Sequence, residues 1–347
     1  NQFHLTIDSF ISLKIILKTL KIWFLVILKS IRIKNIFFKN YRMGFNLTLV
    51  QKNDWSNSFY GIEGLKNILF YFLLNEALKP SDNSSMGLYL QENQGWEFGL
   101  INAWRANQKG KICGVPHFTI RFWDLRYFFY NKYFSSQTDS LFPRPDCVLV
   151  NGIVQKQSLL DNGYPKKELI EIEALRYNYL IHNNKKLENK KNLFKILVLG
   201  DYENSSNEEL LKILEKSLEE FNFKYKIFYK SHPASKQFNF QNKIKMENIN
   251  VSLSKILSKV NFVLCGGNSS ASLDVIYHNI PLAVYLNQKK LNLSPLNKYF
   301  DNLFFSNQTE LVKILKENYF SQHKSLEKIN YFYLDKGIPL WLDFLKK

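Results

Sequence analysis

Residues 261–286, NFVLCGGNSSASLDVIYHNIPLAVYL, contain in one short run the elements that we expect to build this chain. Two apolar runs, 261–264 and 281–286, predict strands, and the pattern at 270–278 between them predicts a helix. Strands joined by a helix lie parallel, because parallel neighbours need a crossover connection. The stretch therefore predicts part of a parallel α/β sheet.

The same alternation of strands and helices extends toward the N-terminus. Directly upstream we expect strands at 195–199 and 224–229 and helices at 207–221 and 252–259. In the first half of the chain we expect strands at 47–50, 87–90, 111–115 and 147–151 and helices at 61–78, 96–107 and 154–162. Ligands of parallel sheets bind in the loops that follow the strands.

A chain of 347 residues exceeds the size at which one hydrophobic core usually stops growing. Residues 182–193, HNNKKLENKKNL, are polar, charged and without apolar periodicity, which is typical of a linker. We therefore predict an α/β protein with two Rossmann-like domains, at 44–181 and 194–347, each a parallel sheet flanked by helices.

Residues 9–33 have a helical pattern with two distinct surfaces. At 100° per residue, one arc of about 100° holds the basic residues Lys14, Lys18, Lys21, Lys29 and Arg32. The remaining surface is almost wholly apolar, so the helix either lies in the interface of an anionic membrane or packs on its own domain with a solvated lysine stripe. Lysines interrupt any run long enough to span a bilayer. We expect residues 1–43 to form a basic amphipathic helical segment.

Composition gives weaker indications. Lys and Arg total 47 against 30 Asp and Glu, and the net charge of +17 favours an anionic partner. A biased base composition would also enrich Lys, together with Asn, Ile and Phe. No nucleic-acid-binding motif accompanies the charge, so we expect no nucleic-acid partner. Three separated cysteines without metal spacing, Cys113, Cys147 and Cys265, indicate buried thiols of a cytoplasmic protein.

Two loops after predicted strands suit a phosphate. In Lys230-Ser231-His232-Pro233 the proline restricts His232 to an extended backbone, and Lys230 supplies a positive charge; a simple turn is the alternative. The second loop offers close backbone approach at two glycines and helix N-cap residues after them, namely Gly266, Gly267, Asn268, Ser269 and Ser270. Simple helix capping would explain those residues too.

Two further groups lie in the first half of the chain. Glu92 follows the strand at 87–90 and is placed to act as a general base, with Glu97 in reserve; helix capping explains both carboxylates equally well. The aromatic stretch 114–128 holds polar side chains that suit an acceptor or a sugar, although a domain core also accommodates such a stretch. These candidate ligands are His117, Arg121 and Asp124.

Three stretches resemble the bacterial surface carbohydrate biosynthesis proteins, a glycosyltransferase group with a GT-B architecture. They are GLYLQENQGWEFGLINAWR (87–105), GVPHFTIRFWDLRYF (114–128) and DCVLVNG (146–152), and the resemblance covers most of 45–290. It implies a GT-B-like fold with an acceptor-side domain at 44–181 and a nucleotide-binding domain at 194–347.

The KSHP and NSSASLD blocks are similar to paired motifs of transferases that use CMP-activated Kdo or sialic acid. This similarity places His232, Ser269 and Ser270 at a CMP phosphate, with Lys230 nearby. CDP-glycerol-type phosphotransferases share a similar pattern, which Asp274 fits. The acidic motif of the Kdo and sialic acid enzymes is absent, and Glu92-Asn93-Gln94-Gly95 stands at a comparable strand end.

These features predict a glycosyltransferase of surface polysaccharide biosynthesis that moves a sugar, from a CMP-sugar, to a glycan or lipid-linked acceptor. We expect inverting, metal-independent chemistry with no cofactor beyond the nucleotide-sugar donor, at the inner face of the cytoplasmic membrane. Glu92 would take the acceptor proton, and Lys230 and His232 would stabilise the leaving phosphate. The alternatives are CDP-polyol phosphotransfer of the teichoic-acid type and a non-catalytic, membrane-associated assembly protein.

Overall fold

The structure is a computed structural model that describes residues 4–39, 48–79, 86–121, 124–128, 143–182, 193–221, 223–235, 244–296, 303–320 and 331–346. The chain forms two compact units. Unit 1 comprises residues 1–116, 129–150 and 160–170; unit 2 comprises residues 117–128, 151–159 and 171–347. Three segments that we expected in the first domain, 117–128, 151–159 and 171–181, thus pack with the second unit. Residues 183–192 of the expected linker lie outside the described residues.

Unit 1 contains a four-stranded sheet in the order β1-β2-β3-β4. Its strands are β1 (Gly87–Leu90), β2 (Ile112–Val115), β3 (Cys147–Val150) and β4 (Leu169–Glu171). β1 pairs with β2, and β2 with β3, in parallel. The strands predicted at 87–90, 111–115 and 147–151 are confirmed to within a residue.

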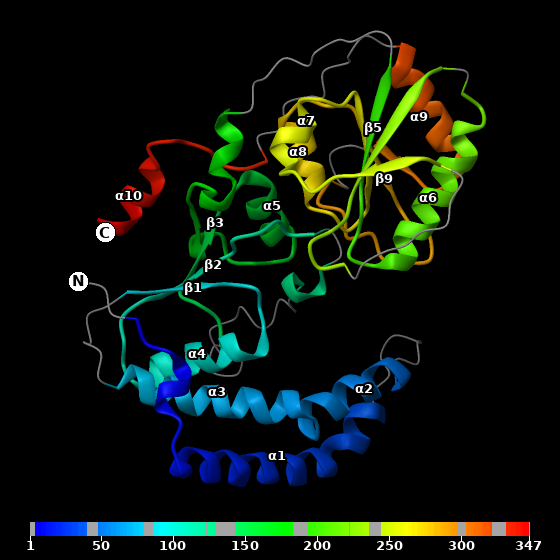
Figure 1. The fold of residues 1–347 in the computed structure, drawn as a ribbon. Coiled ribbons are helices and arrows are strands. Elements are labelled where there is room, and N and C mark those ends of the chain that lie inside the picture. Colours follow the sequence, from blue (N-terminus) through cyan, green and yellow to red (C-terminus); the bar gives the residue numbers. More distant parts are fainter. Residues whose placement is uncertain are drawn as a thin grey trace. The chain divides into compact units, whose positions relative to one another are not determined.

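Helices flank this sheet in sequence and in space (Figure 1). The helices of unit 1 are η1 (Ile7–Phe10), α1 (Leu13–Lys39), α2 (Thr48–Phe59), α3 (Ile62–Leu78), α4 (Gly95–Ala106) and η4 (Lys166–Glu168). Three further helices lie wholly or mostly in the segments that pack with unit 2: η2 (Leu125–Tyr127), α5 (Ile153–Asp161) and η5 (Leu175–His182). The helices predicted at 61–78, 96–107 and 154–162 are confirmed, and the expected N-terminal helix is present as α1. Among the described helices, none combines the length and the apolar character needed to cross a bilayer.

The strand predicted at 47–50 is wrong, because residues 48–59 form the helix α2. A run of four residues with three apolar side chains fits a strand or the first turn of a helix equally well. Here the helix continues to Trp55 and Phe59, which lie four residues apart on one face with ring centroids 4.5 Å apart. Burial of Trp55 ties this segment to the helical layer.

Unit 2 contains a six-stranded sheet in the order β10-β9-β8-β5-β6-β7, and all neighbours pair in parallel. Its strands are β5 (Phe194–Leu199), β6 (Tyr225–Lys230), β7 (Met246–Asn248), β8 (Phe262–Gly266), β9 (Leu282–Tyr285) and β10 (Phe304–Phe305). Its helices are α6 (Asn204–Leu218), α7 (Leu253–Leu257), α8 (Ala271–Tyr277), α9 (Gln308–Phe320) and α10 (Pro339–Leu345). The predicted α/β fold with two parallel sheets flanked by helices is confirmed.

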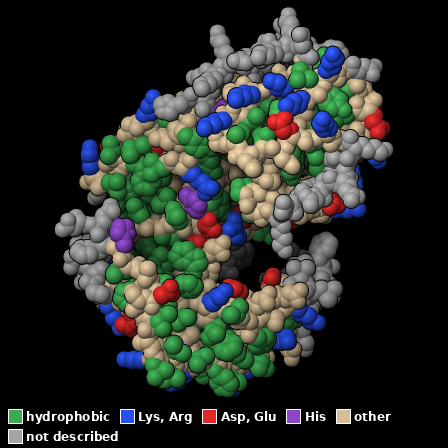
Figure 2. Space-filling view, viewed as in Figure 1, with side chains coloured by type: hydrophobic (Ala, Val, Ile, Leu, Met, Phe, Trp, Pro, Cys, Tyr) green, Lys and Arg blue, Asp and Glu red, His purple; other side chains and the backbone are tan. Residues whose placement is uncertain are grey.

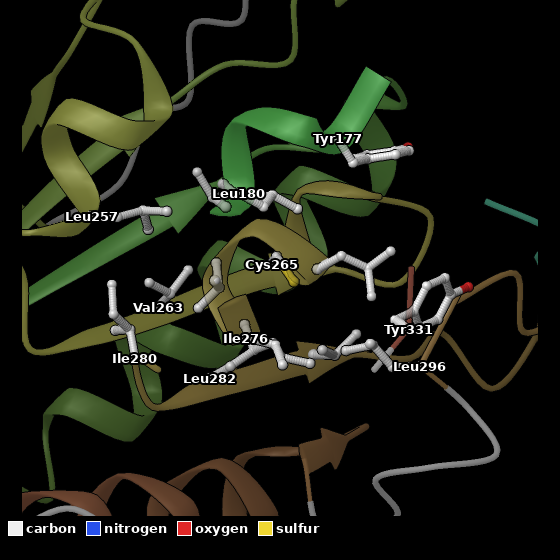
Figure 3. Close-up of a cluster of buried hydrophobic side chains, with 14 of the residues drawn as sticks. Tyr177, Leu180, Leu257, Val263, Cys265, Ile276, Ile280, Leu282, Leu296 and Tyr331 are labelled. Atoms are coloured by element: carbon white, nitrogen blue, oxygen red, sulfur yellow. The ribbon is translucent and has the colours of Figure 1, made fainter. Parts of the chain in front are cut away.

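Alternation along β5 distributes apolar side chains to both faces of the second sheet. Leu197 and Leu199 join a core with α7, α8 and η5, whereas Ile196 and Val198 join a core with α6 and α9. Figure 3 shows the first of these cores, where Val263 of β8 lies near Leu257 of α7. Both faces of this sheet are covered by buried apolar side chains, so polar groups of the sheet that can meet a ligand are expected at the ends of the strands.

Candidate nucleotide-binding site

Three loops leave the carboxyl edge of the second sheet side by side. The register aligns Leu199 of β5 with Lys230 of β6 and with Cys265 of β8. Neighbouring strands lie about 4.8 Å apart, so the loop after β5 stands between the two loops that the sequence singled out. The edge therefore carries residues 200–203, 230–233 and 266–270 in one row.

His232 is oriented by its own loop. Its Nδ1 accepts the backbone N–H of Ala234 at 3.1 Å, and its carbonyl accepts the Ser235 hydroxyl at 2.7 Å. Because Nδ1 is an acceptor, the neutral ring carries its proton on Nε2. The ring of Tyr202 stands beside it, with centroids 6.3 Å apart and an edge-on orientation. His232 can thus offer an Nε2–H donor to an anion.

The Lys230 side chain is held by a hydrogen bond to the backbone of Val251. Its Nζ donates to the carbonyl of Val251 at 2.9 Å. Its own carbonyl accepts the N–H of Gly200, also at 2.9 Å, which ties the loop after β5 to β6. A phosphate would have to draw the Lys230 ammonium away from Val251.

Glycines permit close packing in the loop after β8. A Cβ on Gly266 would lie 3.0 Å from Oδ2 of Asp201, and one on Gly267 would lie 3.0 Å from the carbonyl of Tyr285. Neither position leaves room for an undisturbed side chain. The predicted need for glycine thus has a structural cause that does not depend on a ligand.

The polar residues of this loop differ in their exposure. Ser269 is buried, its N–H donates to the Gly266 carbonyl at 3.2 Å, and its own carbonyl accepts the Ser272 hydroxyl at 2.9 Å. Ser270 is exposed and is the N-cap residue of α8, but its side chain makes no capping hydrogen bond. The Ser270 hydroxyl therefore does not cap α8. The backbone N–H of Asn268 donates to Asp201.

Asp201 is a site residue that the sequence reasoning missed. Its side chain is 2% exposed and accepts the N–H of Tyr202 at 2.6 Å and a backbone N–H of Asn268. Burial raises the pKa of the Asp201 carboxyl, against these hydrogen bonds, which lower it. Asn207 of α6 fixes the turn by bonding the Asp201 N–H and carbonyl at 2.6 and 2.9 Å. The sequence did contain a signal for this residue, because Asp201 is a carboxylate just after the buried strand β5.

An ion pair borders the edge near the β5 loop. Glu203 pairs with Lys290, which follows β9, and Lys290 also reaches the Ser206 hydroxyl at 3.3 Å. This contact lowers the pKa of Glu203 and raises that of Lys290. Lys290 thus compensates the acidic residues of the β5 loop.

The aromatic stretch 114–128 supplies two arginines to this unit, Arg121 and Arg126. Arg121 lies close enough to Tyr177 and Tyr202 that its charge opposes the rise in pKa that burial causes in both phenols. Asp124 does not pair with Arg121 but with Arg126, whose Nε and Nη2 donate at 2.9 and 2.7 Å. His117 packs edge-on against Phe118 with centroids 5.2 Å apart. Among His117, Arg121 and Asp124, Arg121 is therefore the residue whose charge acts on the sheet-edge residue Tyr202.

The two glutamates of unit 1 have different environments. Glu97 is 1% exposed, and its carboxylate accepts the N–H groups of Glu92, Asn93 and Gln94 at 2.9, 2.9 and 3.0 Å. This is a capping box at the start of α4, and burial raises the pKa of Glu97. Glu92 is half-buried, and its side chain accepts from Gln94 Nε2 at 3.3 Å. Of the two, Glu92 is the carboxylate that solvent reaches.

No protein-family model and no curated protein matches this sequence. The S. aureus MnaA–UDP structure matches the fold with a TM-score of 0.50 at 13% identity, over 82% of this chain and 83% of that chain. UDP-N-acetylglucosamine 2-epimerase from Rickettsia bellii gives 0.48 at 12% identity over 80% and 74%. HepE from Anabaena, in complex with UDP and glucose, gives 0.44 at 9% identity over 74% and 73%. At such identities the likeness concerns the fold alone, a GT-B-like α/β architecture.

Proposed function

We propose that this protein is a glycosyltransferase that uses a nucleotide sugar and acts in surface polysaccharide biosynthesis. The observation that carries the proposal is the row of loops 200–203, 230–233 and 266–270 at one sheet edge, where parallel sheets bind ligands. His232 offers an N–H donor there and Ser270 a hydroxyl that does not cap α8. MnaA, which has the same fold, was solved with UDP.

The proposed donor is a CMP-linked acidic sugar. Its support is the similarity of the KSHP and NSSASLD blocks to transferases that use CMP-activated Kdo or sialic acid. Arg121, whose charge acts on Tyr202, offers a positive charge that suits the sugar carboxylate. His117 and Asp124 belong to the same stretch and are proposed as weaker contributors. Because MnaA was solved with UDP, a UDP-sugar is the alternative donor.

The proposed reaction is a direct displacement. The acceptor hydroxyl oxygen forms a bond to the anomeric carbon, the bond from that carbon to the phosphate oxygen breaks, and the nucleotide leaves with the electron pair. Glu92 takes the acceptor proton. His232 Nε2–H, Ser269, Ser270 and Lys230, once released from Val251, would stabilise the departing phosphate, and no metal or cofactor is invoked. Gly266, Gly267 and Asn268 would shape the loop beneath it.

Phosphotransfer from a CDP-polyol would use the same loops. Its support is Asp274, which completes the Ser-Ser-x-x-x-Asp pattern and accepts the Tyr179 hydroxyl at 2.5 Å. The two reactions differ in the bond that breaks: glycosyl transfer leaves the product without the donor phosphorus, and phosphotransfer carries it into the product.

A thermal-shift screen of CMP, CDP, UDP and GDP tests the site, because a ligand that binds only the folded state raises its stability. We expect CMP to give the largest shift. Turnover is then followed with a CMP-sugar and with a CDP-polyol labelled at the phosphorus next to the polyol. No shift by any of the four nucleotides would refute the site, whereas a shift without turnover of either donor would favour a non-catalytic assembly protein.

A further inference from the structure

Helix α1 (Leu13–Lys39) presents three different faces. At 100° per residue, the half-buried or buried positions Ile15, Thr19, Ile22, Val26 and Ser30 fall on one side. Ile15 belongs to a small core with Phe72 and Leu73 of α3, to which η1 also contributes. This face fixes α1 to its own unit, as the packed-helix alternative from the sequence requires.

The face opposite the packed one is apolar and exposed. Six side chains fall within an arc of about 80° and are 42% to 72% exposed: Leu13, Leu17, Leu20, Phe24, Leu28 and Ile31. Figure 2 shows hydrophobic side chains gathered over α1 at the lower edge of the view. The opposite face of α1 packs on α3, so among the described residues this apolar row faces solvent.

The basic residues lie along one flank of that apolar row. Lys14, Lys21, Lys29 and Arg32 are exposed and fall between the apolar row and the packed face. Lys18 is on the same flank, but its Nζ lies 4.5 Å from the ring centroid of Phe72. Between residues 13 and 39 the sequence has no Asp or Glu. An exposed apolar row whose charged neighbours on the helix are all cationic is complementary to a surface that is apolar within and anionic at its boundary.

We propose that α1 is a membrane-docking helix that lies in the interface of an anionic lipid bilayer, with the row Leu13 to Ile31 inserted among the acyl chains. The lysines and the arginine then meet the lipid headgroups. A helix of 27 residues is about 40 Å long, so the row runs along the surface and acts as an extended contact. The inference does not depend on the proposed glycosyl transfer.

The charge pattern argues against a second copy of the chain as the occupant. Two α1 helices that packed their apolar rows together antiparallel would bring two cationic flanks to the same side, and in neither orientation does a partner helix offer an acidic residue. Like charges at such a contact are unfavourable. A bilayer with anionic headgroups meets the same flank with opposite charge.

Flotation with lipid vesicles tests the proposal on the full chain. One variant carries Leu17→Ser, Phe24→Ser and Leu28→Ser, and a second carries Lys14→Gln, Lys21→Gln, Lys29→Gln and Arg32→Gln. The matched controls change exposed residues elsewhere: Ile62→Ser, Val251→Ser and Leu345→Ser for the first, and Lys167→Gln, Lys212→Gln, Lys224→Gln and Lys255→Gln for the second. Circular dichroism establishes that each variant is folded.

We expect the unmodified chain to bind vesicles of equimolar phosphatidylglycerol and phosphatidylcholine at low salt, and to leave them as salt is added. Each basic side chain near an anionic surface contributes about fivefold in partitioning, so the four-charge variant should lose about two to three orders of magnitude. The apolar variant should lose binding to a similar extent, and both controls should bind like the unmodified chain.

Three results would overturn the proposal. If the unmodified chain does not bind the vesicles at low salt, α1 is not a membrane-docking helix. Equal losses in the control variants would show that α1 is not the contact. If sedimentation shows a dimer that only the apolar variant disrupts, the occupant is a second copy. The salt titration uses the unmodified chain, so the test survives misfolding of a variant.

Discussion

Replacing Glu97 with alanine should destabilise unit 1 rather than merely affect catalysis. The carboxylate accepts three backbone N–H groups, from Glu92, Asn93 and Gln94, and is 1% exposed. Each buried donor left without a partner costs about 1–3 kcal/mol. Allowing for water that enters the vacated space, the loss amounts to about 3–6 kcal/mol, a large part of the 5–15 kcal/mol that typically stabilises a domain.

Hydrogen exchange measured by mass spectrometry localises this effect. A peptide that covers residues 91–98 should exchange at least about 100-fold faster in Glu97→Ala, since about 3 kcal/mol corresponds to more than two orders of magnitude. Glu92→Ala is the matched control, because the Glu92 side chain is half-buried and accepts from Gln94 at 3.3 Å. Unchanged protection of this peptide in Glu97→Ala would refute the reasoning and would return Glu97 to the candidates for the general base.

The other predictions concern the proposed site. His232→Ala should weaken nucleotide binding by about 10- to 100-fold, the equivalent of one hydrogen bond to a charged group, and calorimetry that finds equal affinity would remove His232 from the site. The double change Ser269→Ala with Ser270→Ala should weaken nucleotide binding to a similar degree while the circular dichroism spectrum stays unchanged. Full affinity would show that neither hydroxyl contacts the nucleotide. Glu92→Gln should bind donor normally but lose at least about 100-fold in turnover, and an active variant would place the base elsewhere. Because burial raises the pKa of Asp201, its carboxylate is protonated at a higher pH than ordinary carboxylates. Lowering the pH therefore removes a negative charge beside residues 266–270 and should strengthen nucleotide binding. Asp201→Asn should bind nucleotide more tightly at neutral pH and lose this dependence on pH, and a parallel pH profile in both proteins would contradict that.

The arrangement of strands was predictable because buried parallel strands are short, continuous apolar runs between helices. β5, β8 and β9 were found within one or two residues for this reason. β7 and β10 were not expected, since MEN and FF carry no pattern and become strands only through pairing at the edges of a sheet. Tertiary context determines these elements.

The candidate site was predictable in its loops but not in its side-chain roles. The rule that ligands meet strand ends led to 230–233 and 266–270, and the same rule applied to the strand end at Leu199 would have found Asp201. The roles of Glu97 and Asp124 depend on which neighbours lie within hydrogen-bond distance. Glu97 bonds Gln94 and Asp124 bonds Arg126, which are near neighbours in sequence. The sequence offers other partners at similar separations, so it could not select these.

The central position of β5 has a consequence for how the protein is made. β5 pairs with β6 on one side and with β8 on the other, although α6, β6, β7 and α7 lie between β5 and β8 in the chain. During synthesis β5, α6 and β6 emerge first, with the second edge of β5 still lacking its partner. Closing the long intervening segment is entropically costly, and pairings distant in sequence form slowly. Nascent chains that end before residue 262 should therefore expose an apolar strand edge and depend on chaperones until β8 arrives.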